Sequence, residues 1–153
     1  MGEIRILINA AIGNLERSKQ DIYKQIENII LDCQDISEAN HFLFHIDDCW
    51  YSIYFHARNK LKELSEHELA IQGIQDAVAE AHEVGEDTDG ESVSDLMQEV
   101  NDPLIDIIAE CWKQAGGNLL SQPAYITFHD SYCYWDIKQD RYVQEDSIEH
   151  LIS

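Results

Sequence analysis

Residues 41–56 read HFLFHIDDCWYSIYFH, and the architecture of the chain depends on whether they form one helix or two strands. A hairpin would place aromatic strands on either side of a polar pair. Within a helix over 37–64, the apolar residues instead follow one another at steps of three and four. This stripe comprises Leu43, Ile46, Trp50, Ile53, Ala57, Leu61 and Leu64. Acidic residues precede the stripe and basic residues close it, as the helix dipole favours, so we predict a helix and keep the hairpin as the alternative.

The segment before it has the same helical spacing. Its apolar residues are Ile4, Ile8, Ala11, Ile12, Leu15, Ile22, Ile26, Ile29 and Cys33. The residues SKQD (18–21) interrupt the stripe and resemble a capping box, so the pattern fits one long helix or two. In either case it is expected to pack within a bundle of helices.

The segment after it begins with SEHE (65–68), which has the form of a capping box. An apolar stripe follows and stops at Gly85, a residue type that favours helix ends. We therefore predict a helix over 65–84. The polar residues 85–92 predict a loop.

Two more helices are expected before the chain changes character. A short helix ends near Val100, and Asp102 followed by Pro103 has the pattern of a helix start. The helix that begins there is expected to end at Gly116-Gly117.

Beyond Pro123 the apolar residues recur at every second position instead of every third or fourth. Apolar and polar residues alternate within the segments 124–129, 132–137 and 141–144, and turn residues separate these segments. This pattern predicts a three-stranded meander. The sequence thus predicts an α+β fold that is mainly α. Four to six helices in bundle-like packing would be joined to a small C-terminal three-stranded antiparallel sheet, in a single domain over 1–153.

The charge of the chain is strongly negative. It carries 30 Asp and Glu against 10 Lys and Arg, a net charge of −20. Nucleic acids and anionic membranes repel such a protein, so neither is an expected partner. The charge is also uneven, because residues 63–112 contain no Lys or Arg. A basic protein is the partner that this distribution favours.

The candidate partner-binding residues lie mostly in that stretch. They are Asp76, Glu80, Glu83, Glu86, Asp87, Asp89, Glu91, Asp95 and Glu99. In the predicted meander, Tyr132 and Tyr134 alternate with residues expected in the core, and exposed tyrosines often anchor interfaces. A merely solvated acidic surface is the alternative interpretation.

Chemistry of other kinds has weaker support in the sequence. His41, His45, Cys49 and His56 would share one side of the helix predicted over 37–64, where they could hold zinc, but no CxxC or HExxH element accompanies them. That possibility stays open. We predict no catalytic residue, no cofactor and no metal site.

One acidic pattern resembles a known enzyme motif. Glu80-x-x-Glu83 followed by Glu99-x-x-Asp102 resembles the ExxE…ExxD magnesium motif of all-α nucleoside-triphosphate pyrophosphohydrolases. Carboxylates one helical turn apart can hold Mg²⁺ against a phosphate chain. This resemblance implies a metal-dependent nucleotide hydrolase as one alternative function.

In size, acidity and lack of catalytic motif, the chain resembles the small acidic immunity proteins that accompany bacterial polymorphic and contact-dependent toxins. The resemblance implies a non-catalytic inhibitor that masks the cationic site of a toxin or nuclease. The N-terminal segment has helical spacing rather than a signal-peptide pattern, so a cytoplasmic protein is expected. A nucleic-acid mimic that inhibits a DNA-binding protein is the other alternative, and the oligomeric state stays open.

Overall fold

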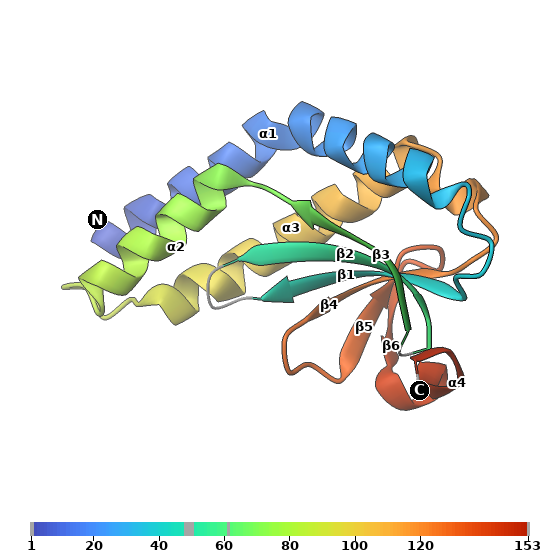
Figure 1. Ribbon diagram of the computed structural model, residues 1–153. Coiled ribbons are helices and arrows are strands. Elements are labelled where there is room, and N and C mark those ends of the chain that lie inside the picture. Colours follow the sequence, from blue (N-terminus) through green and yellow to red (C-terminus); the bar gives the residue numbers. More distant parts are fainter. Residues whose placement is uncertain (1, 48–50, 61, 153) are drawn as a thin grey trace.

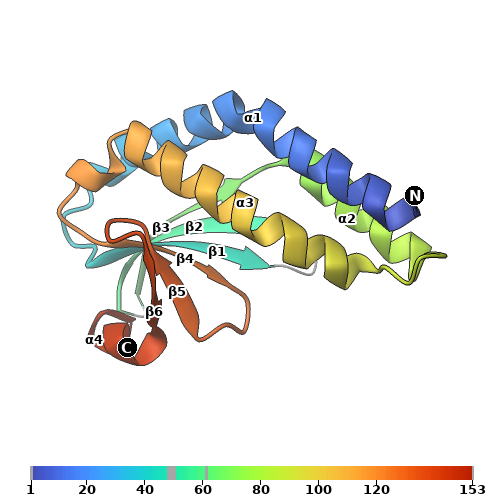
Figure 2. The same ribbon diagram turned by 180° about the vertical axis from the view of Figure 1, so that it is seen from behind.

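A computed structural model describes residues 2–47, 51–60 and 62–152. Within these residues, six strands form one sheet, and three long helices cover one of its faces (Figures 1 and 2). The elements are α1 (Glu3–Cys33), β1 (His41–Asp47), β2 (Ser52–Asn59), β3 (Lys62–Leu69), α2 (Gln72–Val84), α3 (Val93–Gln114), the 3₁₀ turn η1 (Gly117–Leu119), β4 (Ala124–Phe128), β5 (Cys133–Asp136), β6 (Arg141–Gln144), the 3₁₀ turn η2 (Glu145–Ile148) and α4 (Glu149–Ile152).

The sheet is mixed, with strand order β3-β2-β1-β4-β5-β6. Each half is an antiparallel meander, and the halves join through one parallel pair, β1 with β4. Helices α2 and α3 lie in the connection between β3 and β4, because parallel neighbours need a long crossover. The predicted bundle with a separate C-terminal three-stranded sheet is therefore wrong. The predicted strands after Pro123 do form, but they are half of a larger sheet.

The helix predicted over 37–64 is also wrong, since the chain forms the hairpin of β1 and β2, with Phe44 opposite Phe55. Every second side chain of β1, among them Phe42 and Phe44, packs into the core beneath the helices. Leu43, on the opposite face of β1, is buried as well. A strand buried on both faces carries apolar residues at both parities, and this produced the helix-like spacing. Three residues of the sequence predictions lie outside the described residues: Trp50 and Leu61 of the predicted apolar stripe, and Cys49 of the possible zinc site.

The capping box predicted at 65–68 is instead part of strand β3, and the helix α2 starts only at Gln72. Strand β3 pairs with β2 at the edge of the sheet. Its Glu66 and Glu68 are exposed while Leu69 is buried, the alternation of a half-buried strand. Pairing with β2 therefore overrode the local helix signal.

The helix break predicted at Asp102-Pro103 does not occur. Helix α3 is continuous through Pro103 and begins with a capping box between Ser92 and Asp95. A proline inside a helix costs about 3 kcal/mol. The buried stripe that continues from Val100 to Leu104 offsets this cost, because both residues pack into the same core.

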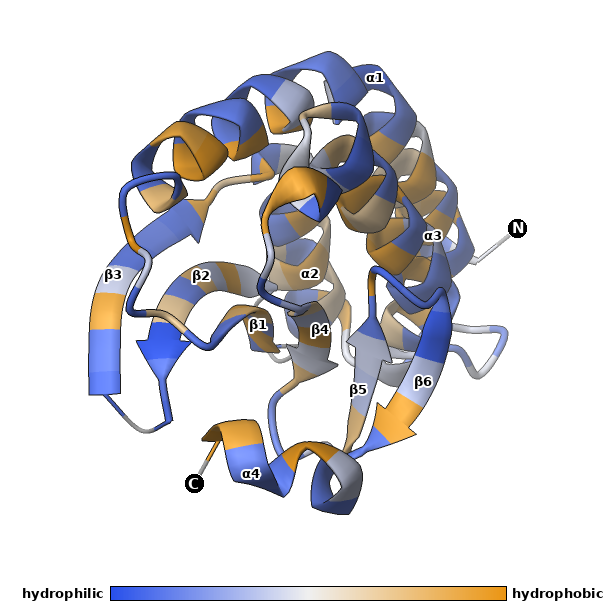
Figure 3. Ribbon diagram, turned by 90° about the vertical axis from the view of Figure 1, so that its right-hand side faces the viewer, coloured by the Kyte–Doolittle hydropathy of each residue, from blue (hydrophilic) through white to orange (hydrophobic). Residues whose placement is uncertain are grey.

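Helix α1 is one uninterrupted helix, so the possible break at 18–21 is absent. Every residue of its predicted stripe is buried except Ile12, which is half-buried. Figure 3 shows the same pattern: the outer surface of α1 is hydrophilic, and hydrophobic residues of the helices turn toward the sheet. No helix in the described ranges is both long enough and apolar enough to span a bilayer.

The centre of the core is aromatic. The ring of Trp112, on α3, lies 5.7 Å from those of Phe42 and Phe44 and 5.8 Å from that of Phe55. On the other side of the sheet, which we call the open face, Ile148 packs against Leu43 and Tyr125. Among the described residues, η2 and α4 cover one end of the open face (Figure 1).

Candidate functional site

The acidic loop 85–92 is fastened to the start of α1. The carboxylate of Asp87 accepts hydrogen bonds from the backbone N–H groups of Ile4, Asp89 and Glu91 at 2.9–3.0 Å. Desolvation raises the pKa of Asp87, but the backbone hydrogen bonds outweigh it and lower that pKa overall. Asp87 thus holds the loop against the helix.

Three more of the predicted partner-binding acids have partners within the chain. Arg5 on α1 pairs with Glu91 at 2.6 Å and with Glu99 at 2.7 Å. Asp95 accepts a hydrogen bond from the backbone N–H of Ser92 at 2.9 Å and completes the cap of α3. These acids stabilise the fold, and they are poor candidates for binding a second protein.

The carboxylates of Glu80 and Glu83 lie elsewhere, on the exposed side of α2 facing α1. Together with Glu3 they border a pocket of about 520 Å³ between the two helices. Its apolar lining comes from Ile6, Leu7 and Val84. We call these six residues the acidic groove. The side chain of Ile6 is 54% exposed, so it offers apolar surface beside the carboxylates.

Glu80 and Glu83 were predicted from the sequence as partner-binding residues, but the part of the groove that α1 lines was not predicted. Glu3 lies far from them in the chain and comes close only because α1 packs beside α2. The exposure of Ile6 could have been predicted, because Ile6 lies between Ile4 and Ile8 of the buried stripe and therefore points away from the core. The remaining predicted acids, Asp76, Glu86 and Asp89, are exposed but do not line the groove.

The two predicted tyrosines also lie outside the groove. Tyr132 is 74% exposed beside the turn before β5. Tyr134 lies on the open face, where its ring contacts that of Tyr125 edge-on at 6.2 Å. The acids and the tyrosines therefore do not form one contiguous surface.

The histidines proposed from sequence share a face, but it is the open face of the sheet and not one side of a helix. The ring of His41 is buried and its Nδ1 lies 2.6 Å from Asn40 Oδ1. His45 lies beside His129, and desolvation together with His129 lowers the pKa of His45. Cys49, the fourth residue of the possible zinc site, lies outside the described residues, and His41, His45 and His56 do not form a group with converging ligand atoms. Among the residues that are described, the group with converging ligand atoms is His56, Glu63 and Glu66.

The ExxE…ExxD pattern does not come together either. Glu80 and Glu83 lie on α2, whereas Glu99 and Asp102 lie on α3 and Glu99 is already paired with Arg5. No three of these four carboxylates, all of which are described, lie within ligand distance of one another.

Comparison with known proteins gives no relative from which a site could be transferred: no family model, no curated protein and no solved structure matches this chain. The acidic groove and the open face are thus to be interpreted from their own chemistry.

Proposed function

We propose that the protein is a non-catalytic inhibitor of the immunity type, which binds a basic toxin or nuclease through the acidic groove. The observation that carries this proposal is the exposed Ile6 side chain among three carboxylates. Binding there would place the inhibitor over the cationic site of its partner, where an acidic surface is attracted most strongly.

The groove combines the two properties that such an interface needs. Its apolar lining can bury a hydrophobic or aromatic side chain of the partner, and buried anchors of this kind supply most of the binding energy. Its carboxylates, from Glu3, Glu80 and Glu83, are placed to pair with Lys or Arg at the rim. Charged rims mainly accelerate and orient association.

The electrostatic surroundings strengthen this interpretation. No Lys or Arg is present among the lining residues, all of which are described. The nearby cation Arg5 is engaged by Glu91 and Glu99. Within the described part of the chain, no ion pair neutralises the carboxylates of the groove. An apolar side chain among unpaired carboxylates is the combination that binds an amphipathic partner surface.

The first test removes the charge of the groove. The partner for the test is the basic domain that this proposal expects to be encoded beside the gene for this chain. The triple variant Glu3→Gln, Glu80→Gln, Glu83→Gln should slow association by at least about tenfold at low ionic strength, because steering by charge is lost. Surface plasmon resonance at low and high salt measures the rate, and the difference should vanish at high salt.

The matched control is Asp35→Asn, Glu38→Gln, Asp146→Asn, which removes three exposed charges outside the groove. It should associate nearly as fast as the wild type. Equal slowing by both variants would mean that only the total charge matters. If the chain binds no neighbouring product, the proposed function itself fails, and capture of several unrelated DNA-binding proteins would point to a nucleic-acid mimic instead.

The second test concerns the apolar part of the groove. Ile6→Ser should accelerate dissociation of the same complex by about tenfold or more while leaving association nearly unchanged, since apolar anchors act after encounter. Leu31→Ser is the control, because Leu31 is equally exposed, at 56%, on the same helix. A similar acceleration by the Leu31 variant would show that the groove has no special role.

A further inference from the structure

A second site lies on the open face of the sheet, where β3 pairs with β2. The pairing is irregular: Ala57 lies opposite Ser65, but the next residue, Arg58, lies opposite Glu63. One extra residue of β3, Leu64, is therefore bulged. Such a bulge changes the face to which a side chain points, and bulges are common beside functional sites.

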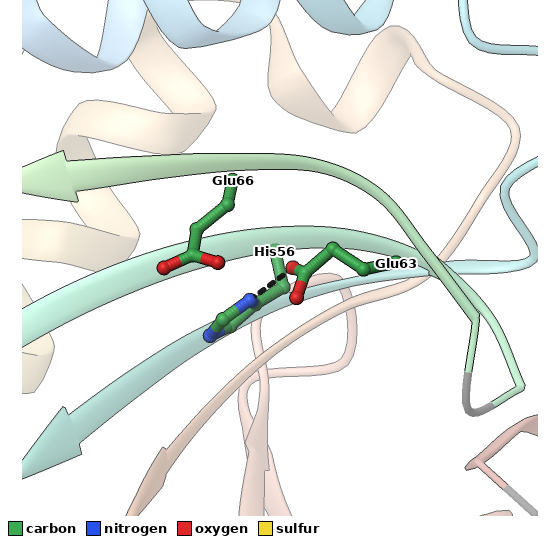
Figure 4. Close-up of side chains that lie close together, drawn as sticks. All are labelled: His56, Glu63 and Glu66. Carbon is green, nitrogen blue, oxygen red and sulfur yellow. Dashed lines mark hydrogen bonds and ion pairs between the residues drawn. The ribbon is translucent and has the colours of Figure 1, made fainter.

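The bulge brings two carboxylates to one histidine. His56 lies opposite Glu66, so their side chains share the open face. In a regular strand, Glu63 would point to the other face, but the bulge turns it to the same one. Figure 4 shows the result, with both glutamate side chains directed at the ring of His56. One ligand atom from each of the three residues lies within 4.8 Å of the others.

The three residues differ in mobility in a way that suits ion binding. The ring of His56 is only 8% exposed and its Nδ1 contacts Glu63 Oε1, so it is held in place. Both glutamates are exposed and can change rotamer. A tetrahedral ion about 2.0–2.2 Å from each ligand needs ligand atoms about 3.4 Å apart. Small rotations of the two glutamates achieve this while the histidine stays fixed.

The described residues balance the charge at this point only in part. Glu66 makes no hydrogen bond or ion pair with any other described residue. For Glu63, the nearest cation is Arg58, whose Nη2 is 3.9 Å from Glu63 Oε2, too far for a strong hydrogen bond. The two carboxylates and the imidazole nitrogen therefore offer three donor atoms to a cation.

We propose that His56, Glu63 and Glu66 bind one divalent first-row transition-metal ion, with Zn²⁺ as the preferred chemical type. An imidazole nitrogen combined with carboxylate oxygens suits such ions better than Ca²⁺ or Mg²⁺, which take oxygen ligands alone. The imidazole of His56 binds the ion through an unprotonated ring nitrogen, and the two glutamates bind it as carboxylates.

Both glutamates are exposed, so solvent can reach the rest of the coordination sphere. Three protein ligands and one open position filled by water is an arrangement known for zinc. The bound ion also links β2 to the edge strand β3. The site is on the face opposite the acidic groove, and it does not depend on the proposed function.

The test is titration of the purified full chain with Zn²⁺ by calorimetry. One ion per chain should bind, with a saturable heat. Substitution of Co²⁺ should give the visible absorption of a coordinated ion. Glu66→Gln and Glu63→Gln should each weaken binding by about tenfold or more, and neither change affects the core.

The control variant is Glu68→Gln, which removes one exposed carboxylate from the same strand and the same face without touching the three ligands. It should bind Zn²⁺ as the wild type does. Absence of a saturable site would overturn the proposal. So would equal weakening by Glu68→Gln and Glu66→Gln, because the ion would then be held by the general negative charge of the chain.

Discussion

Replacing Trp112 with alanine should lower the free energy of unfolding by about 3–5 kcal/mol. The indole is fully buried and contacts the rings of Phe42, Phe44 and Phe55, so its removal opens a cavity between α3 and the sheet. Chemical unfolding followed by circular dichroism measures the loss. Tyr142→Ala serves as the control, since Tyr142 is 52% exposed and should lose far less.

Two related changes sharpen this result. Trp112→Phe should lose less than Trp112→Ala, because within the described residues the indole Nε1 has no hydrogen-bond partner and only volume is lost. Gly117→Ala should also be destabilising, since its Cβ would lie 2.2 Å from the indole Cε2. If Trp112→Ala costs no more than Tyr142→Ala, the indole is not at the centre of the core.

The second large effect is a pH dependence from His41. Burial, together with the charge of Arg58, lowers the pKa of His41 from 6.5 to about 4. The fold therefore favours the neutral ring, and the unfolded chain binds the proton more readily. The contribution of His41 to stability is complete above pH 6.5 and is lost as the pH falls to 4, by up to about 3 kcal/mol.

A comparison of variants isolates this contribution from the many carboxylates. The difference in unfolding free energy between wild type and His41→Gln should change by that amount between pH 6.5 and 4, and should be constant above pH 7. His150→Gln is the control, because His150 is exposed near the end of the chain. Parallel pH profiles for the wild type and His41→Gln would contradict the assignment.

Local patterns predicted some elements correctly because their burial is one-sided or because turn residues separate them. The stripe of α1 reflects a single buried face, and the structure has this helix where it was expected. The strands β4, β5 and β6 also form where they were expected, because turn residues separate them, although β4 is buried on both faces. The hairpin of β1 and β2 failed the first condition, because Phe44 is buried on one face of the sheet and Leu43 on the other. Periodicity alone does not separate such a strand from a helix.

The sites depended on contacts between distant segments and were only partly predictable. The sequence identified Glu80 and Glu83, yet it could not separate them from Glu91 and Glu99, whose partner Arg5 is close only in the folded chain. The cluster at His56 was missed for a related reason. Glu63 was assigned to the end of one predicted helix and Glu66 to the start of the next, and a bulge in a strand has no reliable signature in one sequence.

The parallel pair of β1 and β4 also has a consequence for how the chain folds. It joins Phe42 to Ala124, so its formation closes a loop of 124 − 42 = 82 residues. Each half of the sheet has short connections and can form early. The pairing of β1 with β4, which we call the seam, forms only after this long loop has closed. The refolding rate is therefore set by the seam, and it should be slower than that of a helical bundle of equal length.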